Sequence, residues 1–191
     1  MTVSLYKWTI QDWHTLVESG VLAEKKVELL AGDIVQMSPE GFKHSGTNSS
    51  VADYLRDLLK GKAYIREGHP ITLDESCQGG IIRASEPEPD IAIVKLPREI
   101  YLQGHPVAKD IYWLIEVSDR TLAKDLGSKA NIYAQNGIPE YWIIDLRNNK
   151  VIVHLQPSSG KYQSIKEYRS GEFQPLAFPE LNVQLNQLLL Y

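Results

Sequence analysis

A glutamate stands inside one of the most apolar stretches of the chain. Glu116 lies in the run YWLIEVS, with Ile115 before it and Val117 after it. Burying a carboxylate costs several kcal/mol unless a cation, a set of hydrogen bonds or a raised pKa compensates for the lost hydration. Glu116 is therefore a candidate functional residue, and the alternative is that it marks the solvent-facing end of its strand.

An aspartate at the start of another apolar segment strengthens this interpretation. Asp90 follows Pro89 and precedes the segment IAIV. Alone it indicates little, because acidic residues are common at strand starts. With Glu116 it gives two carboxylates at the ends of central strands, and neighbouring strands lie about 4.8 Å apart. Carboxylates at that spacing repel unless they share a proton or a divalent cation, and oxygen ligands completed by water suit Mg²⁺. The pair predicts a Mg²⁺ site, with Mn²⁺ as an alternative metal.

A lysine borders the buried face of the helix predicted over residues 120–136. On a wheel of about 100° per residue, one arc holds the apolar side chains Leu122, Ala123, Leu126, Ala130, Tyr133 and Ala134. Lys129 falls about 20° outside this arc, so its ammonium either meets a buried partner or extends to solvent. An ion pair with Asp125, four residues earlier, is the plain alternative. Lys124 lies well away from the arc and is expected to be solvated.

Other catalytic signatures are absent from the sequence. It contains no phosphate-binding GxxxxGK[ST] loop, no GxGxxG fingerprint and no GxSxG nucleophile elbow, and its five histidines lack paired metal-ligand spacing. These absences exclude nucleotide-driven mechanisms. A two-carboxylate hydrolase acting on sugars is a weaker alternative, because a lysine borders the core face and the sequence suggests no aromatic cleft.

The elements that must position these residues form an α/β pattern. Apolar periodicity and breaker residues predict helices over 4–20, 42–60, 120–136 and 181–190, a hairpin over 25–39, and extended segments at 63–66, 71–73, 91–94, 111–118, 140–146, 151–155 and 162–167. The helix between the 111–118 and 140–146 strands is a crossover of the length that a parallel pair needs. The expected fold is a mixed central β-sheet flanked by helices.

Length and composition indicate an ordinary soluble protein. The 191 residues are 43% hydrophobic and 23% charged, which fits a single domain over 1–191. No apolar run is long enough to span a membrane, and the first residues lack the apolar core of a signal peptide. Cys77 is the only cysteine. It is expected to be buried or half-buried, and a chain without disulfides suits the cytoplasm.

The net charge of −4 argues against a protein that coats nucleic acid by bulk electrostatics. It leaves room for a local basic groove. Lys43, Arg56, Lys60 and Arg83 are the side chains expected to line one.

The combined pattern resembles a nuclease superfamily. The P-D at one strand start and E-V-S at the end of another are similar to the motif of the PD-(D/E)XK nucleases. The blocks EPDIAIV and IEVSDRTLAKDLGSKANIYAQNGIPEYWIIDL, with KVELLAGDIVQMSP and His44 upstream, resemble a large bacterial family of putative restriction endonucleases of unknown function. The similarity extends over roughly residues 10–155. It implies a restriction-endonuclease-like αβββαβ core with an N-terminal helix and hairpin and C-terminal strand additions.

The resemblance also implies roles for individual residues. Asp90, Glu116 and the backbone carbonyl of Val117 would bind the metal. The superfamily places its catalytic lysine two residues after the glutamate, where this chain has Ser118. The family resemblance implies that the lysine has migrated to the following helix, at Lys129. Glu28 and His44 occur in stretches similar to the family's N-terminal motifs, and either could border the metal site.

Two functions of different classes follow. The first is a Mg²⁺-dependent endonuclease that hydrolyses phosphodiester bonds in DNA. The second is an inactive nuclease-fold module that binds a partner or nucleic acid, which Ser118 and the acidic net charge favour. The position of the Lys129 amine relative to Asp90 and Glu116 distinguishes them.

A homodimer is also expected, because two copies match the two-fold symmetry of duplex DNA. The C-terminal segment adds to this expectation, since it carries apolar side chains that could remain exposed at an interface. These side chains are Leu181, Val183, Leu185 and Leu188 to Leu190. The alternative is that this segment packs on its own sheet.

Overall fold

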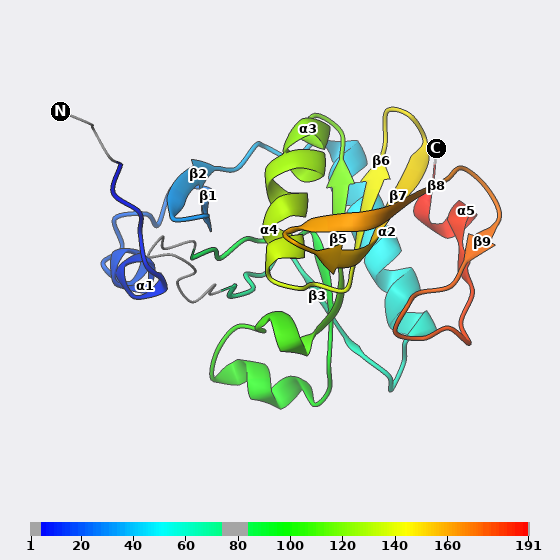
Figure 1. Ribbon diagram of the computed structural model, residues 1–191, viewed down its shortest axis with the longest axis horizontal. Coiled ribbons are helices and arrows are strands. Elements are labelled where there is room, and N and C mark those ends of the chain that lie inside the picture. The colour runs from blue at the N-terminus through cyan, green and yellow to red at the C-terminus, as the bar shows by residue number, and fades with distance from the viewer. Residues whose placement is uncertain (1–4, 74–83, 191) are drawn as a thin grey trace.

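A six-stranded mixed sheet lies at the centre of the computed structural model, which describes residues 5–73 and 84–190 (Figure 1). The strand order is β3-β4-β5-β6-β7-β8. The bounds are β3 Tyr64–Glu67, β4 Ile91–Val94, β5 Ile111–Ser118, β6 Glu140–Asp145, β7 Lys150–Ser158 and β8 Lys161–Tyr168. Two short 3₁₀ helices, Arg98–Leu102 and Ala108–Asp110, connect β4 to β5.

The strand pairing confirms the predicted fold class. Strand β5 runs parallel to β6, whereas the other neighbouring pairs of this sheet are antiparallel. The helical crossover between β5 and β6 meets the requirement of a parallel pair for a long connection. Helix α2 (Phe42–Leu58) precedes β3, so the chain has the αβββαβ order.

Each face of the sheet has its own apolar layer, because side chains alternate along a strand. Trp113, Ile115 and Val117 of β5 pack in the cluster that includes α2. Leu114 belongs to the cluster on the opposite face, together with Tyr133 of α4 (Ala130–Gln135). In the second half of β5 the even-numbered residues Leu114 and Glu116 therefore face the crossover helix.

The crossover helix contains a π-helical turn. It consists of α3 (Leu122–Lys124), the π turn η3 (Asp125–Lys129) and α4, and the Ala130 N–H bonds to the Asp125 carbonyl. A π turn changes the phase of a helix and is frequent at functional sites. Asp125 is 1% exposed, whereas Leu126 is 41% exposed. The predicted inward positions of Leu126 and Ala123 are therefore wrong, since Ala123 is also exposed.

The N-terminal part forms a separate helix and hairpin. Helix α1 (Ile10–Glu18) begins later than predicted because Thr9 and Asp12 form a capping box at its start. Strands β1 (Val27–Leu30) and β2 (Asp33–Gln36) form the predicted hairpin. An isolated bridge between Leu29 and Glu86 ties this hairpin to the segment that leads to Asp90.

The C-terminal segment differs from the prediction. Instead of a helix over 181–190, strand β10 (Val183–Gln184) pairs with β9 (Glu172–Phe173), and a single turn, α5 (Leu185–Leu188), follows. Val183, Leu185 and Leu188 are buried in the α2-side cluster. The alternative that the segment packs on its own sheet therefore holds for these three side chains, whereas Leu190 is 40% exposed. The homodimer stays a prediction.

Two predictions fall on residues outside the described ranges, namely the burial of Cys77 and the groove position of Arg83. Of the helices described, none combines the length and the apolar character that a membrane span requires.

Candidate active site

Strand pairing brings the two predicted carboxylates together. In the antiparallel pair β4–β5, Ile91 lies opposite Ile115. Continuing this register by one residue places Asp90 opposite Glu116, on the face that the crossover helix covers. Both side chains line one small cavity.

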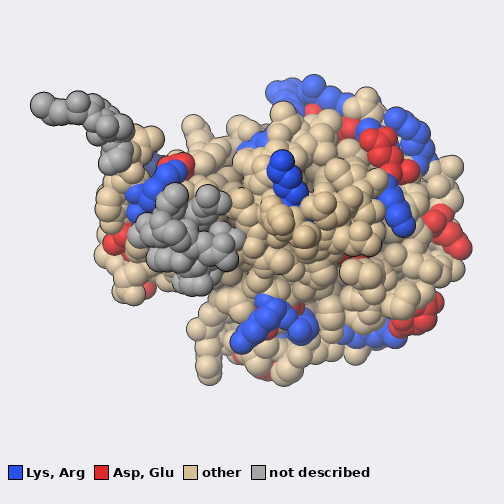
Figure 2. Space-filling view, viewed as in Figure 1, with Lys and Arg blue, Asp and Glu red and all other residues tan. Residues whose placement is uncertain are grey.

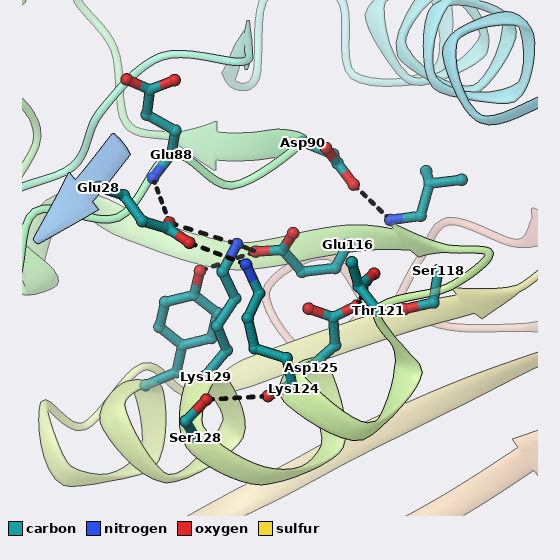
Figure 3. A network of polar contacts seen from close by, with 12 residues as sticks. Glu28, Glu88, Asp90, Glu116, Ser118, Thr121, Lys124, Asp125, Ser128 and Lys129 are labelled. Atoms are coloured by element: carbon teal, nitrogen blue, oxygen red, sulfur yellow. Dashed lines mark hydrogen bonds and ion pairs between the residues drawn. The ribbon is translucent and has the colours of Figure 1, made fainter. Parts of the chain in front are cut away.

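Glu116 is buried and has two donors on one oxygen. Its Oε1 accepts a hydrogen bond from Lys129 Nζ at 2.7 Å and from the Tyr133 hydroxyl at 2.8 Å (Figure 3). Glu116 is 4% exposed and Lys129 is 3% exposed. The Lys129 ammonium therefore reaches the Glu116 strand, and it pairs with Glu116 instead of forming the alternative surface ion pair with Asp125.

Burial and the neighbouring charges shift the pKa values of Glu116 and Lys129. Burial raises the pKa of Glu116, the charges of Asp90 and Asp125 raise it further, and Lys129 opposes them. Burial alone would lower the pKa of Lys129, but the charges of Glu116, Glu28 and Asp90 outweigh it and the pKa is raised. Lys129 is thus a fixed cation beside a carboxyl that is costly to ionise.

Asp90 is held through its other neighbours. Its Oδ2 accepts a hydrogen bond from the Val117 N–H at 2.6 Å and lies 3.0 Å from His44 Nε2. His44 Nδ1 lies 3.5 Å from Glu40 Oε2. Burial alone would lower the pKa of His44, but the hydrogen bond and charge of Asp90, with the charge of Glu40, raise it overall. His44 therefore borders the site, at Asp90.

Glu28 connects two lysines of the crossover helix. It is fully buried, with Lys124 Nζ 2.9 Å from its Oε1 and Lys129 Nζ 3.6 Å from its Oε2. The Glu88 N–H also donates to Oε2, at 3.3 Å. Figure 3 shows the Glu28 carboxylate directed toward the two lysines from the opposite side to their helix. The expectation that Lys124 is solvated is wrong, since its amine is bound to this buried carboxylate.

Ser118, which occupies the position of the superfamily's usual lysine, has a structural role. Ser118 donates a short hydrogen bond to Asp125 Oδ2, which also accepts one from the Thr121 hydroxyl at 2.7 Å. These bonds draw Asp125 inward and fix the start of the π turn. One turn further along, Lys129 is directed at Glu116.

The cavity has the size and the oxygen ligands that a hydrated cation needs. Its volume is about 40 Å³, which is room for about three water molecules. Asp90 Oδ1 and Glu116 Oε2 accept no hydrogen bond from any described residue. Within residues 5–73 and 84–190 no three His, Cys, Asp or Glu side chains are grouped for metal binding. Two carboxylates with several waters are nevertheless a common ligand set for Mg²⁺.

The structure brings together most of the residues that the sequence predicted for the site. Asp90, Glu116, Lys129, Val117, Glu28 and His44 all meet around this cavity. The metal-binding roles of Asp90, Glu116 and the Val117 carbonyl stay predictions. Sequence reasoning missed Lys124 and Tyr133 as partners of the buried carboxylates; the spacing of Tyr133, four residues after Lys129, was the available signal.

Two described members of the predicted basic groove, Lys43 and Arg56, do not lie together. Lys43 lies in the first turn of α2 and Arg56 in its last turn, so the helix separates them by about 20 Å. Arg56 is also engaged by Asp53 and Glu67. On the face in Figure 2, Lys and Arg side chains lie in separate groups with acidic side chains among them.

Replacing Glu28 with glutamine is expected to lower the free energy of unfolding by about 2 kcal/mol, because a buried polar group then faces a donor it cannot bind. The new amide NH₂ would point at Lys124 or Lys129. Urea denaturation measures the change, and Glu18→Gln, at an exposed position, is the control. Equal stability of the two variants would contradict the anchoring role of Glu28.

Comparisons with known proteins identify the family and the fold of the chain. A family model described as "putative restriction endonuclease" (Uma2) matches residues 12–186. Among solved structures, the chain is similar to that of a putative nuclease belonging to DUF820 from Anabaena variabilis, with a TM-score of 0.63 and 20% identity over 87% of this chain and 90% of that one. At this identity the similarity concerns the fold. A search of curated proteins found no match.

Proposed function

Since this chain belongs to the Uma2 family of putative restriction endonucleases, we propose that it is a Mg²⁺-dependent endonuclease that hydrolyses phosphodiester bonds in DNA. The observation that carries the proposal is the buried Lys129 ammonium, 2.7 Å from a Glu116 that lines one cavity with Asp90. A lysine and two carboxylates converging on a small polar cavity suit phosphodiester hydrolysis, where positioning and charge stabilisation do most of the catalysis.

Each residue has a defined task in this proposal. Asp90 and Glu116, with the Val117 carbonyl, would hold Mg²⁺, or Mn²⁺ in its place. When bound, the ion supplies polarisation of the scissile phosphate and lowers the pKa of water. Lys129 opposes the rise in the pKa of Glu116 that burial causes, and it presents a fixed positive charge to the attacking water and to the charge that develops on the phosphate. Tyr133 donates to the same Glu116 oxygen and so limits its rotation, which leaves Oε2 toward the cavity.

The alternative of an inactive binding module has less support. It drew on the acidic net charge, which still favours it, and on Ser118 at the usual lysine position. The Ser118 hydroxyl binds Asp125, and Lys129 supplies an ammonium at Glu116 instead. The position of the Lys129 amine relative to Asp90 and Glu116 is the feature that distinguishes the two functions. The amine lies 2.7 Å from Glu116 and lines one cavity with Asp90, which favours the enzyme.

The test is nicking of supercoiled plasmid with Mg²⁺ or Mn²⁺. We expect the wild type to nick, and Glu116→Gln to lose at least about 100-fold in rate, as for the loss of one essential electrostatic group. Isothermal titration with Mg²⁺ should show binding to the wild type and weaker binding to Asp90→Ala. A wild type inactive with both metals, or an unimpaired Glu116→Gln, would reject the proposal.

A further inference from the structure

Three hollows adjoin at the candidate site. The first is the central cavity already described. A second hollow of about 260 Å³, the lysine hollow, is lined by Lys25 and Lys26 and shares Met37, Glu88 and Asp90 with the central cavity. A third hollow of about 240 Å³, the arginine hollow, is lined by Asp119 and Arg120 and shares Ser38, His44 and Thr121 with it. Glu40 borders all three, so the central cavity is the meeting point of two larger open spaces.

Cations without close partners stand at both outer ends. Lys25 and Lys26 are exposed, and among the described residues their amines have no hydrogen bond or ion pair within 4 Å, although the charge of Lys26 reaches Glu88. The Arg120 side chain is 83% exposed, and Asp119, 3.9 Å away, is its nearest carboxylate. Lys62 and Lys150, by contrast, lie 2.7 Å from a carboxylate oxygen. Lys161 and Lys166 are exposed like the end cations, but they lie on β8 and line none of the three hollows. The three end cations are thus available to a ligand.

Charges of both signs line this series of hollows, and its exposed cations lie at the outer ends. The middle carries the ammonium groups of Lys124 and Lys129 and a larger number of carboxylates, those of Glu40, Glu88, Asp90, Glu116 and Asp125. These carboxylates repel a phosphate unless a divalent cation lies among them, whereas the basic ends attract phosphates directly. A small anion would settle at either end, and only a ligand with several linked phosphates engages both ends and the middle together.

We propose that the three hollows form one path for a nucleic-acid strand. Lys25 and Lys26 bind phosphates on one side of the scissile bond, and Arg120 binds a phosphate on the other side. The inference rests on the proposed phosphodiesterase activity and deepens it, because it makes the preferred substrate a polynucleotide that extends in both directions from the cleaved bond. A minimal phosphodiester fills only the middle and does not sense the end cations.

The first test compares two triple variants of equal charge change. The path variant carries Lys25→Ala, Lys26→Ala and Arg120→Ala. The control variant carries Lys161→Ala, Lys166→Ala and Arg98→Ala, which removes exposed cations from β8 and the β4–β5 connection. Fluorescence anisotropy of a labelled single-stranded oligodeoxynucleotide, with Ca²⁺ present, gives the dissociation constant at several salt concentrations.

We expect the path variant to bind at least about tenfold more weakly at moderate salt, with a plot of log K against log salt that is less steep by about 2. The control variant should match the wild type in both quantities. Equal dissociation constants and salt slopes for the two variants would overturn the path.

Hydrolysis separates failure of the path from failure of the proposed function. With Mg²⁺ or Mn²⁺, the path variant should cleave bis(p-nitrophenyl) phosphate within about twofold of the wild-type rate and show a raised KM for the oligonucleotide. A parallel loss on both substrates would overturn the inference, because the end residues would then act through the centre. A wild type that cleaves neither substrate would reject the proposed function, and the binding comparison would still decide on the path.

Discussion

Replacing Lys129 with methionine is expected to lower the rate of plasmid nicking by about 10²- to 10³-fold, the range for removing one preorganised charge-stabilising group. Methionine keeps an unbranched side chain of similar length but carries no charge. Without the ammonium, the pKa of the buried Glu116 would rise further, because burial and the charges of Asp90 and Asp125 raise it and Lys129 opposes them. A protonated Glu116 is a poor metal ligand, so the variant should also bind Mg²⁺ more weakly in calorimetry.

The matched control is Lys124→Met. It removes a positive charge from the same helix and the same cavity wall, but the Lys124 amine contacts Glu28 and makes no bond to Glu116. A smaller loss of rate is expected, and circular dichroism with urea denaturation shows whether each variant is folded. Equal losses of nicking rate in the two folded variants would mean that any positive charge in the cavity wall serves as well as the Lys129 ammonium.

The sheet could be predicted because its strands have strong local signals. The runs IAIV, IYWLIEVS and EYWIID became β4, β5 and β6, each buried on both faces or nearly so. A helix-length connection between the last two leaves a parallel pairing as the natural solution. The C-terminal helix was wrong because apolar spacing over so few residues cannot separate a helix from a strand and a turn.

The phase of the crossover helix could not be predicted from a wheel. A wheel assumes one rotation per residue throughout, and the π turn at Asp125–Lys129 breaks that assumption. The cause is a set of side-chain bonds to Asp125 from Ser118 and Thr121, which no periodicity reveals. The wheel still placed Lys129 at the edge of the buried face, close enough to identify it as unusual.

The outer parts of the site depend on contacts between distant segments. Glu28 and Lys124 are 96 residues apart in the chain, and His44 and Asp90 are 46 apart. Pairing of this kind follows from how the hairpin docks on the crossover helix, which a single sequence does not specify. Glu116 was recognisable because a carboxylate in an apolar strand contradicts its own local pattern.

Another buried glutamate lies at the start of β6, the strand that pairs with β5. Glu140 begins β6 and is 1% exposed. Its Oε1 accepts a hydrogen bond from Trp142 Nε1 and its Oε2 accepts one from the Leu176 N–H, both at 2.7 Å. Among the described residues no cation pairs with it. Burial raises the pKa of Glu140 to about 7, and the two N–H donors only partly oppose this shift.

The stability of the wild type relative to Glu140→Gln is therefore expected to fall by about 3 kcal/mol as the pH rises from 4.5 to 7, at 1.36 kcal/mol per unit of pKa difference. In this window the folded protein binds a proton at Glu140 that the unfolded chain has released, so rising pH favours unfolding. Glutamine does not titrate, and its amide group facing one N–H donor adds a cost that is the same at every pH.

Urea denaturation of the wild type and Glu140→Gln across this range gives the difference in their free energies of unfolding, in which all other titrating groups cancel. The control is Glu24→Gln, at an exposed position, whose difference from the wild type should not change with pH. A pH-independent difference for Glu140→Gln would mean that this buried carboxyl stays ionised throughout, with its two N–H donors sufficient to hold the charge.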